Sequence, residues 1–94
     1  MVLLMEKTYD NAKGYFYIPI AWREEFNLQE GIEVGIDFIN GIVVIDKTLT
    51  REFSRNVCAK GKLTIPLEVR QLLHTNKYNI YIIQKDKKII LSPK

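Results

Sequence analysis

The side chains best suited to chemistry in this sequence are basic ones in its second half. They are Arg55, Lys60, Lys62 and Arg70. Guanidinium and ammonium groups form charge-assisted hydrogen bonds with phosphate oxygens, so a cluster of them is typical of a surface that binds a nucleic-acid backbone. A basic cluster is more often only a solvated surface. We expect phosphate contact here because the fold predicted below brings these four residues to one end of a barrel.

The first half of the sequence has the opposite charge. Residues 1–47 hold four basic and eight acidic side chains, a net charge of −4, whereas residues 48–94 hold ten and three, a net charge of +7. Lys13 and Arg23 are the plausible phosphate contacts of the first half. Arg23 has other interpretations, which are a salt bridge with a carboxylate such as Glu24 or a structural contact shared with Arg70. The charge split predicts that the second half grips DNA and that the carboxylates face away from it.

Catalysis and metal binding are not predicted. Cys58 and His74 are too few for a zinc site, and the adjacent Glu24 and Glu25 do not face each other on a helix. A nucleophile with an assigned base is also missing. We therefore expect a protein that is not an enzyme and needs no cofactor.

The aromatic residues divide into two groups. Four of them fall on the buried periods of helix and strand and are expected in the core: Phe16, Trp22, Phe26 and Phe38. Tyr15 and Tyr17 belong to a short strand, and one of them must face out. Stacking, a hydrogen bond to phosphate and a protein contact all remain open for an exposed tyrosine.

A tandem repeat must position these residues. At an offset of 47, Ala12-Lys13-Gly14 aligns with Ala59-Lys60-Gly61, Ile18-Pro19 with Ile65-Pro66, and Arg23 with Arg70. After the helix the offset falls to 46, and 43–45 aligns with 89–91. The sequence therefore predicts one domain, residues 1–94, made of repeat one at about 3–47 and repeat two at about 51–94.

Each repeat is predicted to have the element order β-β-α-β-β. Glycine suits the first turn, proline the start of a short helix, and Asn40-Gly41 a type I′ hairpin turn. The expected strands are Leu4–Tyr9, Tyr15–Ile18, Glu33–Ile39, Ile42–Asp46, Glu52–Val57, Lys62–Ile65, Asn79–Gln84 and Lys88–Ser92. Because one such unit leaves exposed edges and a small core, we predict a mainly β fold in which both repeats form one closed barrel.

Composition fits a globular protein. Of its 94 residues, 47% are hydrophobic and 27% charged, and no apolar run is long enough to span a membrane. The apolar residues 1–5 are too short for a signal peptide and read as the lead-in to the first strand. With Cys58 as the lone cysteine, a reducing cytoplasm is expected.

The second repeat resembles the DNA-binding domain of the SpoVT/AbrB family, which includes transition-state regulators and MazE-type antitoxins. The resemblance rests on Arg-Asn-Val-Cys-Ala-Lys-Gly-Lys-Leu-Thr-Ile-Pro-Leu-Glu-Val-Arg-Gln-Leu-Leu, residues 55–73, and on the final strand. The first repeat is similar but looser. In that family two chains interleave as a swapped-hairpin barrel, so the resemblance implies a single-chain barrel with pseudo-two-fold symmetry that binds double-stranded DNA.

Carried over residue by residue, the family's DNA-facing basic positions fall on Arg55, Lys62 and Arg70, beside Lys60. In the first repeat Thr8 and Tyr15 stand where Arg55 and Lys62 stand in the second, which argues against symmetric binding by one chain. A homodimer of such chains is the expected way to cover a two-fold operator. We predict a small transcriptional regulator of bacterial or archaeal type.

The alternative is a protein-binding module, antitoxin-like or an inhibitor, that docks a partner on its acidic first repeat. MazE-type antitoxins wrap their toxin with a disordered tail, whereas this sequence ends at Ser92-Pro93-Lys94, directly after the last expected strand. That ending makes an antitoxin the weaker expectation.

Overall fold

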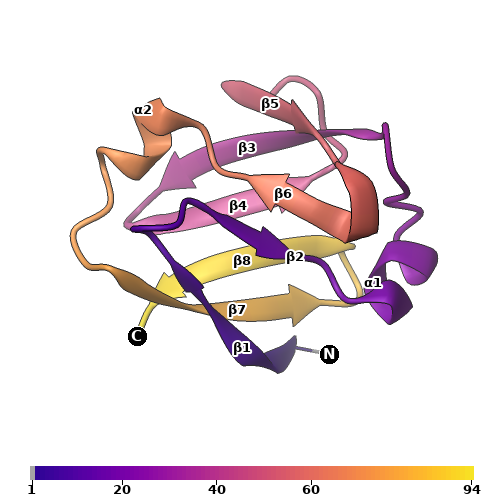
Figure 1. Cartoon of the computed structure of the whole chain (residues 1–94), viewed down its shortest axis with the longest axis horizontal. Coiled ribbons are helices and arrows are strands. Elements are labelled where there is room, and N and C mark those ends of the chain that lie inside the picture. Colours follow the sequence, from indigo (N-terminus) through magenta and orange to yellow (C-terminus); the bar gives the residue numbers. More distant parts are fainter. Residues whose placement is uncertain (1) are drawn as a thin grey trace.

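Residues 2–94 are described by a computed structural model, in which eight antiparallel strands and two short α-helices follow one another along the chain (Figure 1). The elements are β1 (Val2–Asp10), β2 (Tyr15–Tyr17), α1 (Ile20–Glu25), β3 (Glu33–Ile39), β4 (Ile42–Asp46), β5 (Phe53–Asn56), the 3-10 turn η1 (Ala59–Gly61), β6 (Lys62–Thr64), α2 (Leu67–Arg70), β7 (Lys77–Ile83) and β8 (Lys88–Pro93). The mainly β prediction is confirmed, and each expected strand is present with ends shifted by at most two residues. Of the expected lead-in at 1–5, Met1 lies outside the described residues.

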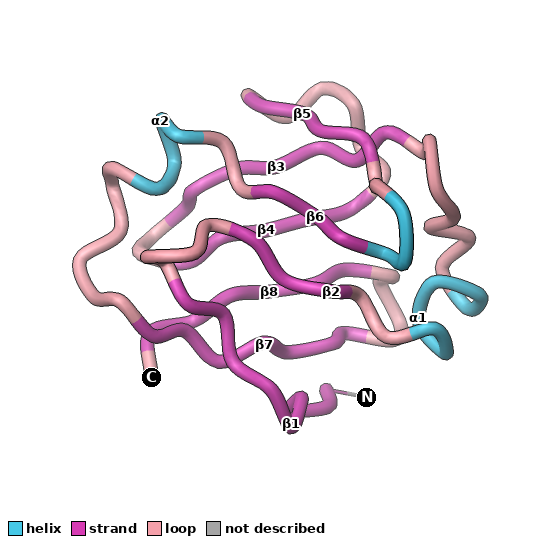
Figure 2. Tube along the Cα trace, viewed as in Figure 1, coloured by secondary structure: helices cyan, strands magenta, loops and turns pink. Residues whose placement is uncertain are grey.

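The strands form one sheet in the order β5-β3-β4-β8-β7-β1-β2-β6, and every neighbouring pair is antiparallel. Figure 2 shows how this sheet curls until its two edge strands, β5 and β6, meet beside η1. There the Cys58 N–H donates to the Lys62 carbonyl at 2.8 Å. The barrel is thus nearly closed rather than fully closed as predicted, because β5 and β6 touch at this turn and then diverge.

Each strand has a neighbour from the other half of the sequence. The β1 strand pairs with β7, β3 with β5, β2 with β6 and β4 with β8. Within a half, β3 pairs with β4 and β7 with β8, but β1 and β2 share only the Asp10–Tyr15 register. The first hairpin of each half therefore finds its main partners in the other half.

Local sequence explains where the elements start and turn. Asn40 and Gly41 have φ values of 51° and 82°, the paired positive angles of a type I′ turn. Pro19 and Pro66 occupy the N-cap positions of α1 and α2. Proline suits a helix start because its nitrogen carries no hydrogen that would lack a partner there.

The inward side chains fill the barrel. Phe16 and Phe26 are buried as expected, and so are Ile18, Ile65 and Val69. Trp22, Phe38 and Leu73 are only half-buried and pack against this core. Tyr9 and Tyr78 are also fully buried, with ring centroids 6.2 Å apart. The Tyr9 hydroxyl donates to Asn11 Oδ1 at 2.9 Å, and burial raises the pKa of Tyr9 to about 12.

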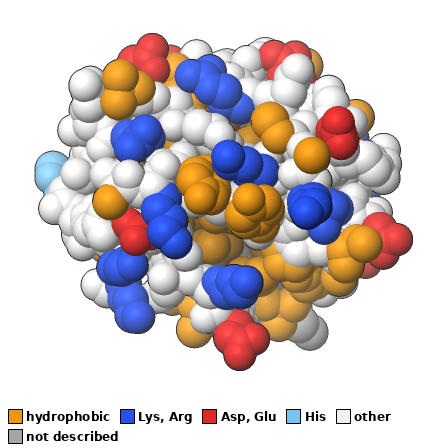
Figure 3. All heavy atoms as spheres, in the orientation of Figure 1, with side chains coloured by type: hydrophobic (Ala, Val, Ile, Leu, Met, Phe, Trp, Pro, Cys, Tyr) orange, Lys and Arg blue, Asp and Glu red, His pale blue; other side chains and the backbone are white. Residues whose placement is uncertain are grey.

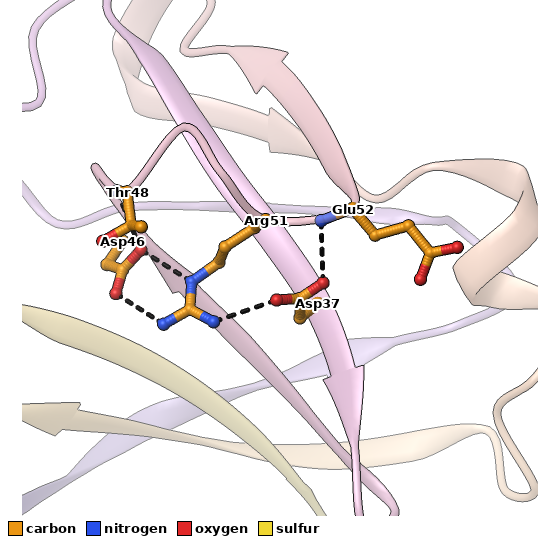
Figure 4. A network of polar contacts seen from close by, with 5 residues as sticks. All are labelled: Asp37, Asp46, Thr48, Arg51 and Glu52. Atoms are coloured by element: carbon orange, nitrogen blue, oxygen red, sulfur yellow. Dashed lines mark hydrogen bonds and ion pairs between the residues drawn. The ribbon is translucent and has the colours of Figure 1, made fainter.

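An ion-pair network anchors the linker between the halves (Figure 4). Arg51 Nε and Nη2 each donate at 2.8 Å to a different oxygen of Asp46, and Nη1 donates at 3.0 Å to Asp37 Oδ2. The Glu52 N–H donates to the remaining Asp37 oxygen at 2.9 Å. The hydrogen bonds from Arg51 hold the pKa of Asp46 below its usual range. The linker is therefore fixed to β3 and β4.

Candidate nucleic-acid interface

The β2 and β6 strands form a short antiparallel ribbon at the front of the molecule in Figure 1. Its register pairs Tyr15 with Thr64, Phe16 with Leu63 and Tyr17 with Lys62. Phe16 and Leu63 are buried beneath the ribbon. Because side chains alternate along a strand, Tyr15, Tyr17, Lys62 and Thr64 share the outer face.

Both tyrosines of β2 therefore face out, whereas the sequence led us to expect this of one of them. Their rings meet edge to face with centroids 5.9 Å apart. Lys62 Nζ lies 4.3 Å from the centroid of the Tyr15 ring. That separation allows a cation–π interaction, so Tyr15 holds the ammonium group on this face.

At one end of the ribbon, the β1–β2 turn contacts α2. Arg70 lies so close to Gly14 that a β-carbon there would be 2.5 Å from the arginine Cζ. Arg70 Nη2 donates to the Asn11 carbonyl, and Asn11 Nδ2 donates to the Arg70 carbonyl, both at 3.2 Å. Lys13 is exposed in this turn. Lys13 and Arg70, one from each half of the sequence, are thus brought to the same end.

At the other end, η1 contacts α1 in the same way. A β-carbon at Gly61 would lie 2.6 Å from Arg23 Cδ, and Arg23 Nε donates to the Ile18 carbonyl at 2.9 Å. Lys60 is exposed beside this contact and has a φ of 61°. Arg23 and Arg70 therefore make equivalent contacts with a glycine of the opposite half. A shared structural contact was one of the interpretations that the sequence left open for Arg23.

We call the four outward ribbon residues, together with Lys13, Arg23, Lys60 and Arg70 at its ends, the β2–β6 face. Figure 3 views the molecule from this side, where Lys and Arg side chains surround an apolar patch at the centre. Arg55 lies on the edge strand β5, which adjoins β6; it is exposed, and its Nη1 donates to the neighbouring Ser54 carbonyl at 2.8 Å. The candidate residues thus lie on or beside one face, but they come from both halves.

A groove of about 560 Å³ lies along the β1 side of this face. The pairing of β1 with β7 shifts register between Leu4 and Thr8, and β1 leaves β2 beyond Asp10–Tyr15. Tyr15, Tyr17 and apolar side chains such as Met5 line the groove, together with Lys7, Lys13, Arg23 and Lys60 and the carboxylates of Glu6 and Asp10. Sequence reasoning missed Lys7, because nothing in the local pattern marks the register shift that brings it here.

Several carboxylates of the first half are neutralised within the chain. Asp10 accepts a hydrogen bond from Lys77 Nζ at 3.0 Å, and this contact lowers the pKa of Asp10. Asp37 and Asp46 both pair with Arg51. Glu24 and Glu25 are exposed on α1. The formal charge of −4 therefore overstates the acidic surface that the first half presents.

Possible metal ligands, membrane-spanning helices and matches to known proteins would also be guides to function. Among residues 2–94, no group of three His, Cys, Asp or Glu side chains is placed to hold a metal ion. Within the same residues, no helix is both long and apolar enough to cross a membrane. No protein-family model, curated protein or solved structure matches the chain.

Proposed function

We propose that this protein binds double-stranded DNA through the β2–β6 face and acts as a small transcriptional regulator of the SpoVT/AbrB type. The observation that carries the proposal is the placement of a lysine and an arginine at each end of a two-stranded ribbon, Lys13 with Arg70 and Lys60 with Arg23. Cations at both ends of an exposed ribbon suit the two phosphate backbones that border a DNA groove.

The dimensions support a groove-bound ribbon. Three residues per strand span about 10 Å, and the major groove of B-DNA is about 12 Å wide and accepts a two-stranded ribbon. With β2 and β6 in the groove, the turns at their ends reach the flanking phosphates. The helices are too short for recognition helices, since α1 has six residues and α2 four.

The strand pairing supports a swapped-hairpin origin for the barrel. In this proposal each repeat lends its first hairpin to the other, because β1 pairs with β7 and β5 pairs with β3. The contacts at the glycines are reciprocal too: Arg23 packs on Gly61, and Arg70 on Gly14. A single chain would then present the surface that two chains form in the family it resembles.

The cations on and beside this face have different freedom. Arg55, Lys60 and Lys13 are exposed, whereas Lys62 is held over Tyr15. Arg23 and Arg70 each donate one hydrogen bond to a backbone carbonyl. A guanidinium has five N–H donors, so each arginine retains donors for phosphate while also fixing the turn. The second repeat supplies more of these cations than the first.

The test is the salt dependence of binding to duplex DNA. If three to five cations replace counterions, log K falls with log salt at a slope of about −3 to −5 per chain. Lys60→Glu with Lys62→Glu should abolish most of the affinity. The matched control is Lys47→Glu with Lys85→Glu, the same charge change at two exposed loop lysines outside the face. A flat salt response, or equal losses in both pairs, would overturn the proposal.

A protein partner is the second candidate function. It is favoured by α1, where Ile20 is 63% exposed next to the exposed Glu24 and Glu25. An apolar side chain flanked by carboxylates suits a basic partner surface. Ile20→Ser with Glu24→Lys should leave DNA affinity unchanged or slightly higher if DNA is the ligand. This reading replaces DNA binding if the charge reversals on the β2–β6 face have no effect.

Association of two chains remains part of the proposal. A homodimer would place two β2–β6 faces on one DNA and so cover a longer operator. The mass of the free protein and of its complex with a saturating duplex decides between one chain and two. A mass of one chain in both measurements would exclude the homodimer.

A further inference from the structure

The two strands of the ribbon offer different chemistry to the same ligand. An antiparallel pair has a local two-fold axis, which here passes between Phe16 and Leu63. It exchanges Tyr15 with Lys62 and Tyr17 with Thr64. The ends of the ribbon are alike under this exchange, since each has a glycine, a lysine and an arginine. The positions that contact phosphate are therefore nearly symmetric, whereas the outward centre is not.

We propose, resting on the DNA binding proposed above, that each chain reads a non-palindromic DNA site through this asymmetric centre. A lysine ammonium only donates hydrogen bonds, so Lys62 selects the O6 and N7 acceptors of guanine. A tyrosine both donates and accepts, and its ring adds apolar contact area. The position related to that guanine by the local two-fold then faces a tyrosine instead of an ammonium.

Tyr15 acts on this selection as a positioning residue. Its ring lies 4.3 Å from Lys62 Nζ, and a cation held over a ring has fewer orientations to lose on binding. Tyr17, the cross-strand partner of Lys62, is 53% exposed and packs against Tyr15. Both tyrosines also line the groove beside β1. The tyrosine side of the ribbon thus borders the groove, so it differs from the β6 side in shape as well as in chemistry.

Sequence selection from a randomised duplex library tests the proposal, with the mass of the complex giving the number of chains per duplex. The wild-type protein is expected to enrich a site with no two-fold symmetry under each chain. Replacing the guanine contacted by Lys62 should weaken binding about 10-fold. Lys62→Met should remove this preference for guanine at that position.

Two symmetrising variants provide the decisive comparison. Tyr15→Lys with Tyr17→Thr gives both strands the chemistry of β6, and Lys62→Tyr with Thr64→Tyr gives both the chemistry of β2. Each should enrich a palindromic site, with guanine in both half-sites for the first variant and in neither for the second. All four side chains point outward, and if one variant fails to fold, the other still decides.

The outcomes separate this inference from the proposed function. A palindrome selected by single wild-type chains would overturn the inference and keep DNA binding. Salt-dependent binding with no enriched sequence would do the same. If no duplex binds at any salt concentration, the proposed function fails and the inference fails with it.

Discussion

The guanidinium of Arg70 occupies the space where a side chain at Gly14 would otherwise stand. A β-carbon at Gly14 would lie 2.5 Å from Arg70 Cζ and 2.7 Å from its Nε and Nη1. Gly14 also has a φ of +81°, which other residues rarely adopt. This glycine is thus required both by the turn of the first half and by an arginine of the second, so the contact stabilises the pairing of the halves.

Gly14→Ala should lower the free energy of unfolding by about 2–4 kcal/mol, through left-handed backbone strain and displacement of Arg70. Gly41→Ala is the matched control, because Gly41 has a φ of +82° and no atom within 4 Å of an added β-carbon. It should cost only the backbone part, about 1 kcal/mol. Urea unfolding of the two variants measures the difference. Equal losses of unfolding free energy would mean that Arg70 moves away from an added β-carbon without destabilising the fold.

A double-mutant cycle isolates the steric contact. In an Arg70→Ala background the space beside Gly14 is empty, so Gly14→Ala should cost no more than Gly41→Ala does in the wild-type protein. Strict additivity of the Gly14 and Arg70 substitutions would contradict the contact. The same cycle at Gly61 and Arg23 would be harder to interpret, since a β-carbon at Gly61 also meets the Ile18 carbonyl oxygen.

Local patterns in the sequence predicted the elements of this fold well. Glycine, proline and the Asn-Gly pair each favour particular backbone angles. Gly14, Pro19 and Asn40-Gly41 therefore indicated turns and a helix start from the local sequence. The pattern around Phe16 likewise predicted that this residue of β2 is buried. These signals depend on neighbours in the sequence and needed no knowledge of distant partners.

Contacts between distant residues could not be predicted in this way. Arg51 was counted as one more positive charge, but its partners Asp37 and Asp46 are fixed only when the linker folds back on β3 and β4. The structural contacts of Arg23 and Arg70 depend on glycines of the opposite half. The register shift in β1 that brings Lys7 to the groove also arises from pairing with a distant strand.

Arg51→Met should destabilise the protein by about 3 kcal/mol, because it leaves Asp46 charged and nearly buried without its partner. The Asp46 side chain is only 7% exposed, and that of Arg51 is 14% exposed. The matched control is Arg55→Met, an exposed arginine bonded to a single carbonyl, which should change stability by less than about 0.5 kcal/mol. Denaturant midpoints compare the two. Similar small changes in both variants would show that the ion pair contributes little.

Acid should weaken the fold through Asp46. The pKa of Asp46 is lowered in the folded state, chiefly by hydrogen bonds from Arg51. A lowered pKa contributes stability that is complete above the unfolded-state value of about 3.9 and is lost as pH falls through the folded-state value. The urea concentration at the unfolding midpoint should therefore fall as the pH is lowered below about 4 in the wild-type protein. A series measured between pH 7 and pH 2 checks this.

Asp46→Asn isolates this carboxyl. The variant should be less stable at pH 7 but should show a shallower loss in acid, because it cannot gain a proton at this position. Some slope must remain, since the pKa of Asp10 is also lowered, chiefly by its hydrogen bond from Lys77. An acid limb as steep as that of the wild-type protein would exclude Asp46 as a main contributor.

Cutting the chain in the linker should yield two fragments that need each other. Fragments 1–48 and 49–94 separate β1 from β7, β3 from β5, β2 from β6 and β4 from β8, so each alone exposes apolar strand faces and unpaired edges. Each fragment should be unfolded or self-associated when isolated. An equimolar mixture should regain a cooperative thermal transition, with the fluorescence of Trp22 as a reporter.

Charge should decide which fragments pair. Self-association would bring together two copies of a half with a net charge near +7, or two near −4, whereas the mixed pair joins opposite charges. The 1:1 complex should therefore predominate in low salt, and its advantage should shrink as salt screens the attraction. Native mass measurements over a salt series can follow all three species. A fragment that folds cooperatively as a monomer would show that the strand pairs between the halves are not needed for folding, and homodimers that prevail in low salt would show that packing outweighs charge in partner choice.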